Sequence, residues 1–220
     1  MTAVHDVPQT EAEWLKARLK GLGASEASAV IGCNPYMSNT DLWKIKTGRK
    51  IAPDISSNAH VAYGHAAEGP IRELFALDYP EYEVRYGGAY DMVHNPDYPW
   101  LFATLDGRLV ERKTGRKGIL EIKTTEILRS MQKEKWRDKI PDNYFCQVIH
   151  QLLATSWDFA ILHAQLKRVW DGEIRTERRT YKIERSDVLE DLDYLLDAEI
   201  RFWTQYVEKD VEPPLLLPEF

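Results

Sequence analysis

Two carboxylates and a lysine stand where two strand-like segments approach each other. In the run 118–124, GILEIKT, Glu121 and Lys123 alternate with apolar residues and therefore point to one face of a strand. Asp106 occupies the polar face of the preceding run, 101–111, and the turn-forming residues between the two runs predict a hairpin. The hairpin brings Asp106 almost opposite Glu121. Like charges across a sheet repel each other, so this pair needs a positive charge beside it.

Two kinds of positive charge would satisfy these carboxylates. Lys123 alone would give a structural ion pair, whereas a divalent cation would bind the clustered carboxylate oxygens that hard cations prefer. Glu68 favours the cation, because it shares a helical stripe with Ile71 and Phe75 and so points toward the interior. A buried carboxylate is costly unless it is paired or bound to a metal. The alternative places Glu68 at the helix edge or beside a Lys or Arg.

Polar side chains on the following segment could support such a site. Gln147 and Gln151 are four residues apart and share a helix face with Tyr144. Buried amides need hydrogen-bond partners, which a helix edge also provides without any function. The histidines show no metal-ligand spacing and are interpreted as structural.

The elements that would position these residues follow from periodicity and capping signals. We expect helices at 11–20, 25–32 with Ser25 as N-cap and Gly32 as stop, 39–48, 58–80 with a kink or a restart at Gly69–Pro70, 126–137, 141–156 and 186–207. We expect strands at 82–93, 101–111, 118–124, 159–170 and 175–184. The order predicts an α/β fold in which helices flank a central mixed β-sheet, as a single domain over residues 1–220. The acidic face of the last helix is expected to be solvated.

Composition limits the classes of protein that this chain could be. It has 220 residues, of which 44% are hydrophobic, and no apolar run is long enough to span a membrane. No secretory signal is visible, so we expect a cytoplasmic protein. Cys33 and Cys146 are too few for a disulfide framework or a four-thiolate cluster, and we expect free thiols packed in the fold.

The charge distribution leaves a nucleic-acid partner open. The net charge is −6, which by itself argues against binding a polyanion. However, residues 184–220 hold 11 acidic and 3 basic residues, so the rest of the chain carries a small positive balance. Basic residues cluster at 16–20, 44–50, 112–117 and 133–139, although each cluster could also be ordinary solvated surface.

Five segments in a fixed order carry a resemblance to a known family. They are WLKARLKGLGASEASAVIG at 14–32, YGHAAEGPIRELF at 63–75, YPWLFATLDG at 98–107, GILEIKT at 118–124 and YFCQVIHQL at 144–152. Together they resemble the phage lambda-type exonucleases, or YqaJ-type viral recombinases, of the PD-(D/E)XK nuclease superfamily. The resemblance covers about residues 14–157 and implies the restriction-endonuclease-like core of that superfamily.

The resemblance implies a metal site. Asp106 and Glu121 match the family's metal-binding carboxylates, and the main-chain carbonyl of Ile122 is expected to complete the set of ligands. Lys123 matches the family's catalytic lysine. Glu68 matches its helical glutamate beside the metal and is a further possible ligand. The implied cofactor is Mg²⁺, with Mn²⁺ as a possible substitute.

The resemblance also implies residues that handle water and DNA. Gln147 matches the glutamine that helps to hold the attacking water, and Tyr144 lies one turn before it, with Gln151 supporting one turn after. Arg18 and Ser25 match the positions that contact the DNA 5′-phosphate. The proline of the family motif is replaced here by Leu105, which should point to the apolar face with little consequence.

The implied activity is a Mg²⁺-dependent 5′-to-3′ exonuclease. It would degrade double-stranded DNA from its ends and leave 3′ single-stranded overhangs for phage-type homologous recombination in a bacterial host. The resemblance further implies a homotrimeric ring and a single-strand annealing protein as partner. One alternative is an endonuclease built on the same carboxylates. Another is a non-catalytic DNA-binding recombination accessory protein, in which Asp106, Glu121 and Lys123 form only an ion pair.

Overall fold

Two mixed β-sheets form the framework of the protein. The computed structural model describes residues 4–55, 57–127, 134, 136–137 and 139–216. The smaller sheet has the strand order β1 (Val4–Asp6), β4 (Met92–His94), β5 (Leu101–Thr104) and β2 (Leu22–Gly23). The larger sheet has the order β3 (Tyr82–Arg85), β6 (Gly107–Glu111), β7 (Lys117–Glu126), β8 (Phe159–Trp170) and β9 (Glu173–Glu184). In the larger sheet β7 and β8 are parallel and the other neighbours are antiparallel, so the predicted mixed sheet is confirmed.

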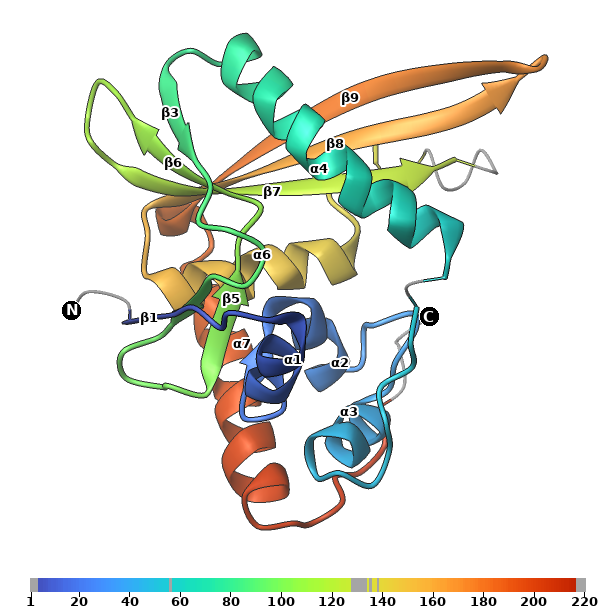
Figure 1. Ribbon diagram of the computed structural model, residues 1–220. Helices are drawn as coiled ribbons and strands as arrows, with labels where there is room; N and C mark the ends of the chain where they lie inside the picture. Colours follow the sequence, from blue (N-terminus) through green and yellow to red (C-terminus); the bar gives the residue numbers. More distant parts are fainter. Residues whose placement is uncertain (1–3, 56, 128–133, 135, 138, 217–220) are drawn as a thin grey trace.

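Helices cover both faces of the larger sheet. The helices are α1 (Glu11–Arg18), α2 (Ala27–Val30), α3 (Asn39–Lys46), α4 (Ala59–Asp78), α6 (Asp142–Thr155) and α7 (Leu189–Arg201). Helix α4 crosses one face of the sheet, and α6 lies against the opposite face, between that sheet and α7 (Figure 1). Short helical turns at Ala24–Glu26, Arg185–Asp187 and Phe202–Val207 flank α2 and α7.

Alternation along β7 sends its apolar side chains into two separate cores. Leu120 and Ile122 pack on the α4 side, in a cluster with Phe75. Ile119 packs on the α6 side, in a cluster with Leu152. Glu121 has the same parity as Ile119 and therefore faces α6, as the two-residue period of a strand requires.

Local signals account for most helix ends and for the outer hairpin. The side chains of Thr10, Ser38 and Asn58 accept hydrogen bonds from main-chain N–H groups in the first turns of α1, α3 and α4. Gly32 ends the turn after α2 with φ of +76°, as predicted. At the tip of β8–β9, Asp171 and Gly172 have φ of +52° and +75°, which suits the tight turn of a two-residue hairpin.

Two expected strands are each divided between the two sheets. The run 82–93 forms β3 in the larger sheet and β4 in the smaller one, and 101–111 forms β5 and β6 in the same way. The physical reason for the second break is that Leu101–Thr104 pairs with β2 and β4, whereas Gly107–Glu111 pairs with β3 and β7. The predicted central mixed sheet is the larger sheet, and the smaller sheet is joined to it by residues 86–91 between β3 and β4 and by residues 105–106 between β5 and β6.

Three expected helices also differ from the structure. Helix α4 is continuous from Ala59 to Asp78, with Pro70 inside it. A helix was expected at 126–137, but its first residue, Glu126, is the last residue of β7 and pairs with β8. Residues 128–133 and 135 of this expected helix lie outside the described residues. The segment 25–32 consists of the turn Ala24–Glu26 and the single turn α2, and Gly23 rather than Ser25 is its N-cap.

The acidic residues Glu190, Asp191, Asp193 and Asp197 of the last helix are exposed, as expected, but Glu199 beside its apolar stripe is buried. Glu199 of α7 is fully buried and lies 2.6 Å from Nδ1 of His150 on α6, also fully buried. The other ring nitrogen of His150 lies 2.8 Å from the carbonyl of Phe102 in β5. A charge without a partner would be too costly in this position, and the His150 ring provides the partner that lets α7 pack here.

Candidate active site

Asp106 lies where the chain passes from one sheet to the other. The main-chain N–H of Ile122 donates a 2.7 Å hydrogen bond to Asp106 Oδ2. Strand β6 pairs with β7 only as far as Leu120, so the edge of β7 beyond that residue is open to the Asp106 carboxylate. The N–H and C=O of a strand residue point to the same edge. The carbonyl of Ile122 therefore faces the same side as Asp106, as the predicted set of ligands requires.

The turn that carries Asp106 is held by an arginine that the sequence reasoning missed. Arg72 Nη1 donates a 2.6 Å hydrogen bond to the main-chain oxygen of Asp106, and the guanidinium lies 3.7 Å from the centre of the Tyr86 ring. Gly107 follows, and a Cβ there would come within 3.1 Å of Leu120 Cβ. The four-residue spacing of Arg72 from Glu68 on α4 was the signal available in the sequence.

Glu121 is the centre of the predicted cluster. It is only 2% exposed, and its carboxylate receives donors from two elements. Lys123 Nζ lies 2.6 Å from Oε1, and Gln147 Nε2 donates to the same oxygen at 2.6 Å. Gln151 Nε2 donates to Oε2. Helix α6 thus supplies both glutamines from successive turns of one face, as their four-residue spacing predicted.

Lys123 lies between the carboxylates and α6. Its ammonium is 5.1 Å from the centre of the Tyr144 ring, which places Tyr144 one turn before Gln147 beside the cluster. Burial alone would lower the pKa of Lys123, but the neighbouring carboxylates of Glu121 and Asp106 outweigh burial and raise it. Lys123 is therefore a positively charged ammonium that compensates part of the negative charge.

Glu68 approaches the same cluster from α4. Its side chain is 32% exposed, and Oε1 lies 3.4 Å from Nδ1 of His65. The sequence left Glu68 either buried, at the helix edge or paired with a Lys or Arg; its side chain is half-buried, with a histidine beside it. Partial burial raises the pKa of Glu68, and the Glu121 carboxylate raises it further. Glu68 therefore lies close enough to Glu121 for the negative charge of Glu121 to raise the pKa of Glu68.

The donor set fits a hard divalent cation. Burial raises the pKa of Asp106 well above its usual range, and the carboxylates of Glu121 and Glu68 add to the effect. The carboxylates of Glu68, Asp106 and Glu121 therefore influence one another, with Lys123 as the neighbouring positive charge. The predicted donors are carboxylate oxygens and the Ile122 carbonyl, and Mg²⁺ and Mn²⁺ prefer such oxygen ligands to nitrogen or sulfur. Within the described residues, no group of three or more His, Cys, Asp and Glu side chains is arranged as a metal site.

Arg18 and Ser25, predicted to contact a phosphate, lie together. Arg18 Nη2 is 3.4 Å from Ser25 Oγ and 3.7 Å from Glu26 Oε1, and its guanidinium lies 4.8 Å from the centre of the Trp14 ring. The sequence reasoning missed the support beneath them. Lys46, whose side chain is 1% exposed, lies 2.7 Å from Glu26 Oε2 and donates a 2.8 Å hydrogen bond to the carbonyl of Arg18.

Strand β5 connects this arginine to the carboxylates. The Arg18 guanidinium is 5.9 Å from the centre of the Phe102 ring, and Trp14 Nε1 donates a 3.4 Å hydrogen bond to Thr104 Oγ1. Asp106 follows Phe102 by four residues, which corresponds to about 13 Å of extended chain. Leu105, between them, is buried in the apolar core, as predicted for the residue that replaces the motif proline.

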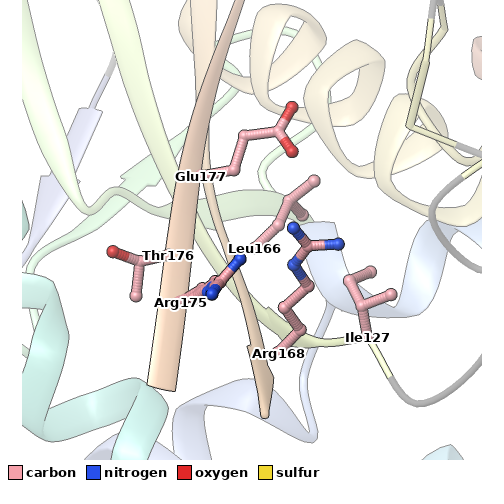
Figure 2. Close-up of a pocket in the computed structure, with 6 residues that line it drawn as sticks. All are labelled: Ile127, Leu166, Arg168, Arg175, Thr176 and Glu177. Carbon is pink, nitrogen blue, oxygen red and sulfur yellow. The ribbon is translucent and has the colours of Figure 1, made fainter. Parts of the chain in front are cut away.

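A cavity beside the outer hairpin is separate from this cluster. It has a volume of about 200 Å³ and lies at the end of β7 and along β8 and β9 (Figure 2). Its lining residues are Ile127, Leu166, Arg168, Arg175, Thr176 and Glu177. None of the residues predicted for the site contributes to it. The candidate site is therefore the open edge of β7 and not this cavity.

Solved structures show how this fold is related to known ones. An alkaline exonuclease from Laribacter hongkongensis, LHK-Exo, matches with a TM-score of 0.69 at 21% identity, over 91% of this chain and 94% of that one. LHK-Exo in complex with dAMP matches with a TM-score of 0.60 at 18% identity, over 90% and 95%. A phage related exonuclease from Haemophilus somnus matches with a TM-score of 0.57 at 12% identity, over 86% and 96%. The chain thus shares the mixed α/β fold of these exonucleases.

Sequence comparison identifies the family. The uncharacterized protein YqaJ of Bacillus subtilis (strain 168) is 32% identical over 214 residues, which are 92% of this chain and 58% of that protein. The chain thus spans little more than half the length of this relative. The family model of the YqaJ-like viral recombinase domain matches residues 13–158, a range that contains every residue of the candidate site. This chain belongs to the YqaJ-like viral recombinase domain family.

Proposed function

We propose that this protein is a metal-dependent exonuclease that degrades duplex DNA from its 5′ ends. The observation that supports the proposal is that Asp106, Glu121 and Lys123 lie together at the open edge of β7. Gln147 is bound to the same Glu121 carboxylate. LHK-Exo, which shares the fold, has been solved with dAMP, a nucleoside monophosphate of the kind that stepwise digestion releases. Family membership supports a role in phage-type recombination.

Each residue of the cluster has a distinct part in the proposed reaction. Asp106, Glu121 and the Ile122 carbonyl would hold Mg²⁺, or Mn²⁺ in its place. The metal would polarise the scissile phosphate and lower the pKa of a bound water. Lys123, held by Glu121, would stabilise the charge that develops on the phosphate. Gln147 would orient the water, because its amide lies at Glu121 Oε1, the oxygen that Lys123 also contacts.

The proposed polarity depends on the arginine pocket. Arg18 and Ser25 together offer a charged, forked donor and a hydroxyl, which suit a terminal phosphate. Because β5 joins this pocket to Asp106, a 5′-phosphate bound there would place the first nucleotides of that strand near the carboxylates. Digestion would then proceed 5′ to 3′ and leave 3′ single-stranded overhangs.

The wider assembly follows from the same proposal. A homotrimeric ring would enclose the DNA, and a single-strand annealing protein would receive the 3′ overhang. The reaction would take place in the cytoplasm of a bacterial host that carries the phage or prophage. Within the described residues, no helix is long and apolar enough to cross a membrane.

One assay separates the proposal from its two rivals. The protein is incubated with Mg²⁺ and linear duplex DNA that carries 5′-phosphates and a label at either the 5′ or the 3′ end, beside a covalently closed circle of the same sequence. The proposal expects early release of the 5′ label as mononucleotide, late release of the 3′ label, and an intact circle. Cleavage of the circle would identify an endonuclease. No cleavage of either DNA, with Mg²⁺ or Mn²⁺, would favour the accessory protein.

A further inference from the structure

Two cysteines from distant parts of the chain are in contact. Cys33 Sγ lies 3.4 Å from Cys146 Sγ, although the residues are 113 positions apart. Both are free thiols, as the sequence predicted, but the sequence offered no sign that they meet. Cys33 lies in the loop after Gly32, and Cys146 lies on α6 and is 8% exposed. The pair therefore bridges the loop after α2 and helix α6.

We propose that Cys33 and Cys146 form a redox-responsive dithiol that a hydroperoxide converts into an intramolecular disulfide. The sulfur atoms need to approach by only about 1.4 Å to reach the S–S bond length. Cys33 can make this movement because it belongs to a loop, whereas Cys146 is fixed in its helix. The inference is independent of the proposed nuclease activity.

A cavity gives a small oxidant access to the pair. It has a volume of about 890 Å³ and lies among α2, α6, α7 and the chain after Val211. Both cysteines line it, together with Asp142, Arg201 and Leu216. This is a route for a hydroperoxide, which is a small polar molecule. The thiols are thus packed against each other but not sealed from solvent.

The two thiols differ in a way that assigns their roles. The hydrogen bond from Cys146 lowers the pKa of the half-buried Cys33 thiol. Conversely, the same contact and burial raise the pKa of Cys146. The thiolate is the nucleophilic form of cysteine, so Cys33 is the residue that attacks the oxidant and Cys146 is the one that resolves the product.

The chemistry balances in two steps. The Cys33 thiolate attacks one oxygen of hydrogen peroxide, the O–O bond breaks, and Cys33 becomes a sulfenic acid while hydroxide leaves and takes a proton to form water. The Cys146 sulfur then attacks the Cys33 sulfur, the S–OH bond breaks, and a second water leaves with the Cys146 proton. Two thiols lose two electrons in total, and one peroxide gains them.

The bond would link both sides of the candidate site. Cys146 directly precedes Gln147, whose amide binds Glu121, and Cys33 follows α2 and the turn Ala24–Glu26 that contains Ser25. Closing a loop of more than a hundred residues removes many conformations from the unfolded chain. The oxidised protein should therefore resist unfolding better than the reduced one.

The test begins with the full chain, reduced, desalted and treated with hydrogen peroxide. Free thiols should fall from two to none, the intact mass should drop by two hydrogens, and peptide mapping should join Cys33 to Cys146 within one chain. Dithiothreitol should restore both thiols. The proposal is overturned if both thiols still titrate, if the mass rises through oxygen addition without a cross-link, or if the disulfide joins separate chains.

Single variants test whether Cys33 attacks the oxidant and Cys146 resolves the product. In Cys146→Ser, Cys33 should form a sulfenic acid that dimedone traps, whereas in Cys33→Ser the remaining thiol should stay reduced. The oxidised wild type should melt about 5 to 15 °C above the reduced form. The double variant should show no peroxide-dependent shift. An unchanged wild-type melting temperature would mean that the bond forms outside the native structure and would refute the proposal.

Discussion

The main-chain N–H of Ile122 in β7 donates a 2.7 Å hydrogen bond to the carboxylate of Asp106, which lies in the link between β5 and β6. This bond ties the open edge of β7 to the point where the chain changes sheets. It therefore holds one carboxylate beside the backbone of the strand that carries Glu121 and Lys123. The cluster of Asp106, Glu121 and Lys123 depends on this hydrogen bond. A substitution can remove the charge of a side chain in the cluster and keep its hydrogen bonds.

Replacing Asp106 by Asn should remove activity and leave the fold intact. The amide oxygen can still accept the Ile122 hydrogen bond, but the negative charge that would hold a metal is lost. We expect the rate of mononucleotide release to fall at least about 100-fold. The free energy of unfolding, measured with urea, should stay equal or rise, because burial opposes the ionised Asp106 and raises its pKa. The exposed hairpin variant Glu173→Gln is the matched control, and a fully active Asp106→Asn would exclude Asp106 from the site.

The two glutamines that bind Glu121 should differ in their effect on stability. In Gln151→Ala, Glu121 Oε2 loses the donor that Gln151 supplies, and the free energy of unfolding should fall by about 1–3 kcal/mol. Gln147→Ala should cost less, because Glu121 Oε1 keeps Lys123 at 2.6 Å and Gln147 is less buried. Urea unfolding of both variants gives the comparison. Equal losses, or a larger loss for Gln147→Ala, would contradict the observed contacts.

Arg18 should determine the preference for phosphorylated ends. In Arg18→Gln, the ratio of digestion rates on 5′-phosphorylated and 5′-hydroxyl duplexes should fall about tenfold or more, since a hydrogen bond to a charged group is lost. The neighbouring surface variant Lys16→Gln, on the same helix, controls for a general loss of positive charge. If Arg18→Gln keeps the wild-type ratio, the arginine pocket does not bind the 5′-phosphate.

The buried pair His150 and Glu199 should make stability depend on pH. Burial alone would lower the pKa of His150, but the Glu199 carboxylate and the Phe102 carbonyl outweigh burial and raise it above 6.5. The folded state therefore favours the imidazolium. Its stabilising contribution is complete below about pH 6.5, the pKa of an unperturbed histidine, and is lost as the pH rises through the elevated pKa of the folded state.

The comparison that isolates this effect is urea unfolding of wild type and Glu199→Gln at pH 6 and pH 9. Wild type should lose stability toward pH 9, and the variant should lose less over the same interval because the carboxylate that favours the imidazolium is gone. At pH 6 the variant should be less stable by about 3–5 kcal/mol, the usual cost of breaking a buried ion pair. Parallel pH profiles for the two proteins would show that the pair does not titrate as described.

The sequence alone determined the parts of the site that depend on short-range periodicity. Alternation in GILEIKT placed Glu121 and Lys123 on one face of β7, and the four-residue spacing of Gln147 and Gln151 placed both amides on one face of α6. These placements survive in the structure because strand and helix periods are set by the local backbone. The turn residues between β6 and β7 likewise predicted the hairpin that brings Asp106 to Glu121.

Only the tertiary structure decided which segments meet across long separations. The division of 101–111 between two sheets, the hydrogen bond from Arg72 to Asp106, and the contact of Cys33 with Cys146 all join parts of the chain that have no local signal for each other. Glu199 lies beside the apolar stripe of its helix, but only the packing of α7 on α6 shows that His150 is its partner. Such pairings depend on how whole elements pack, so spacing within one element cannot reveal them.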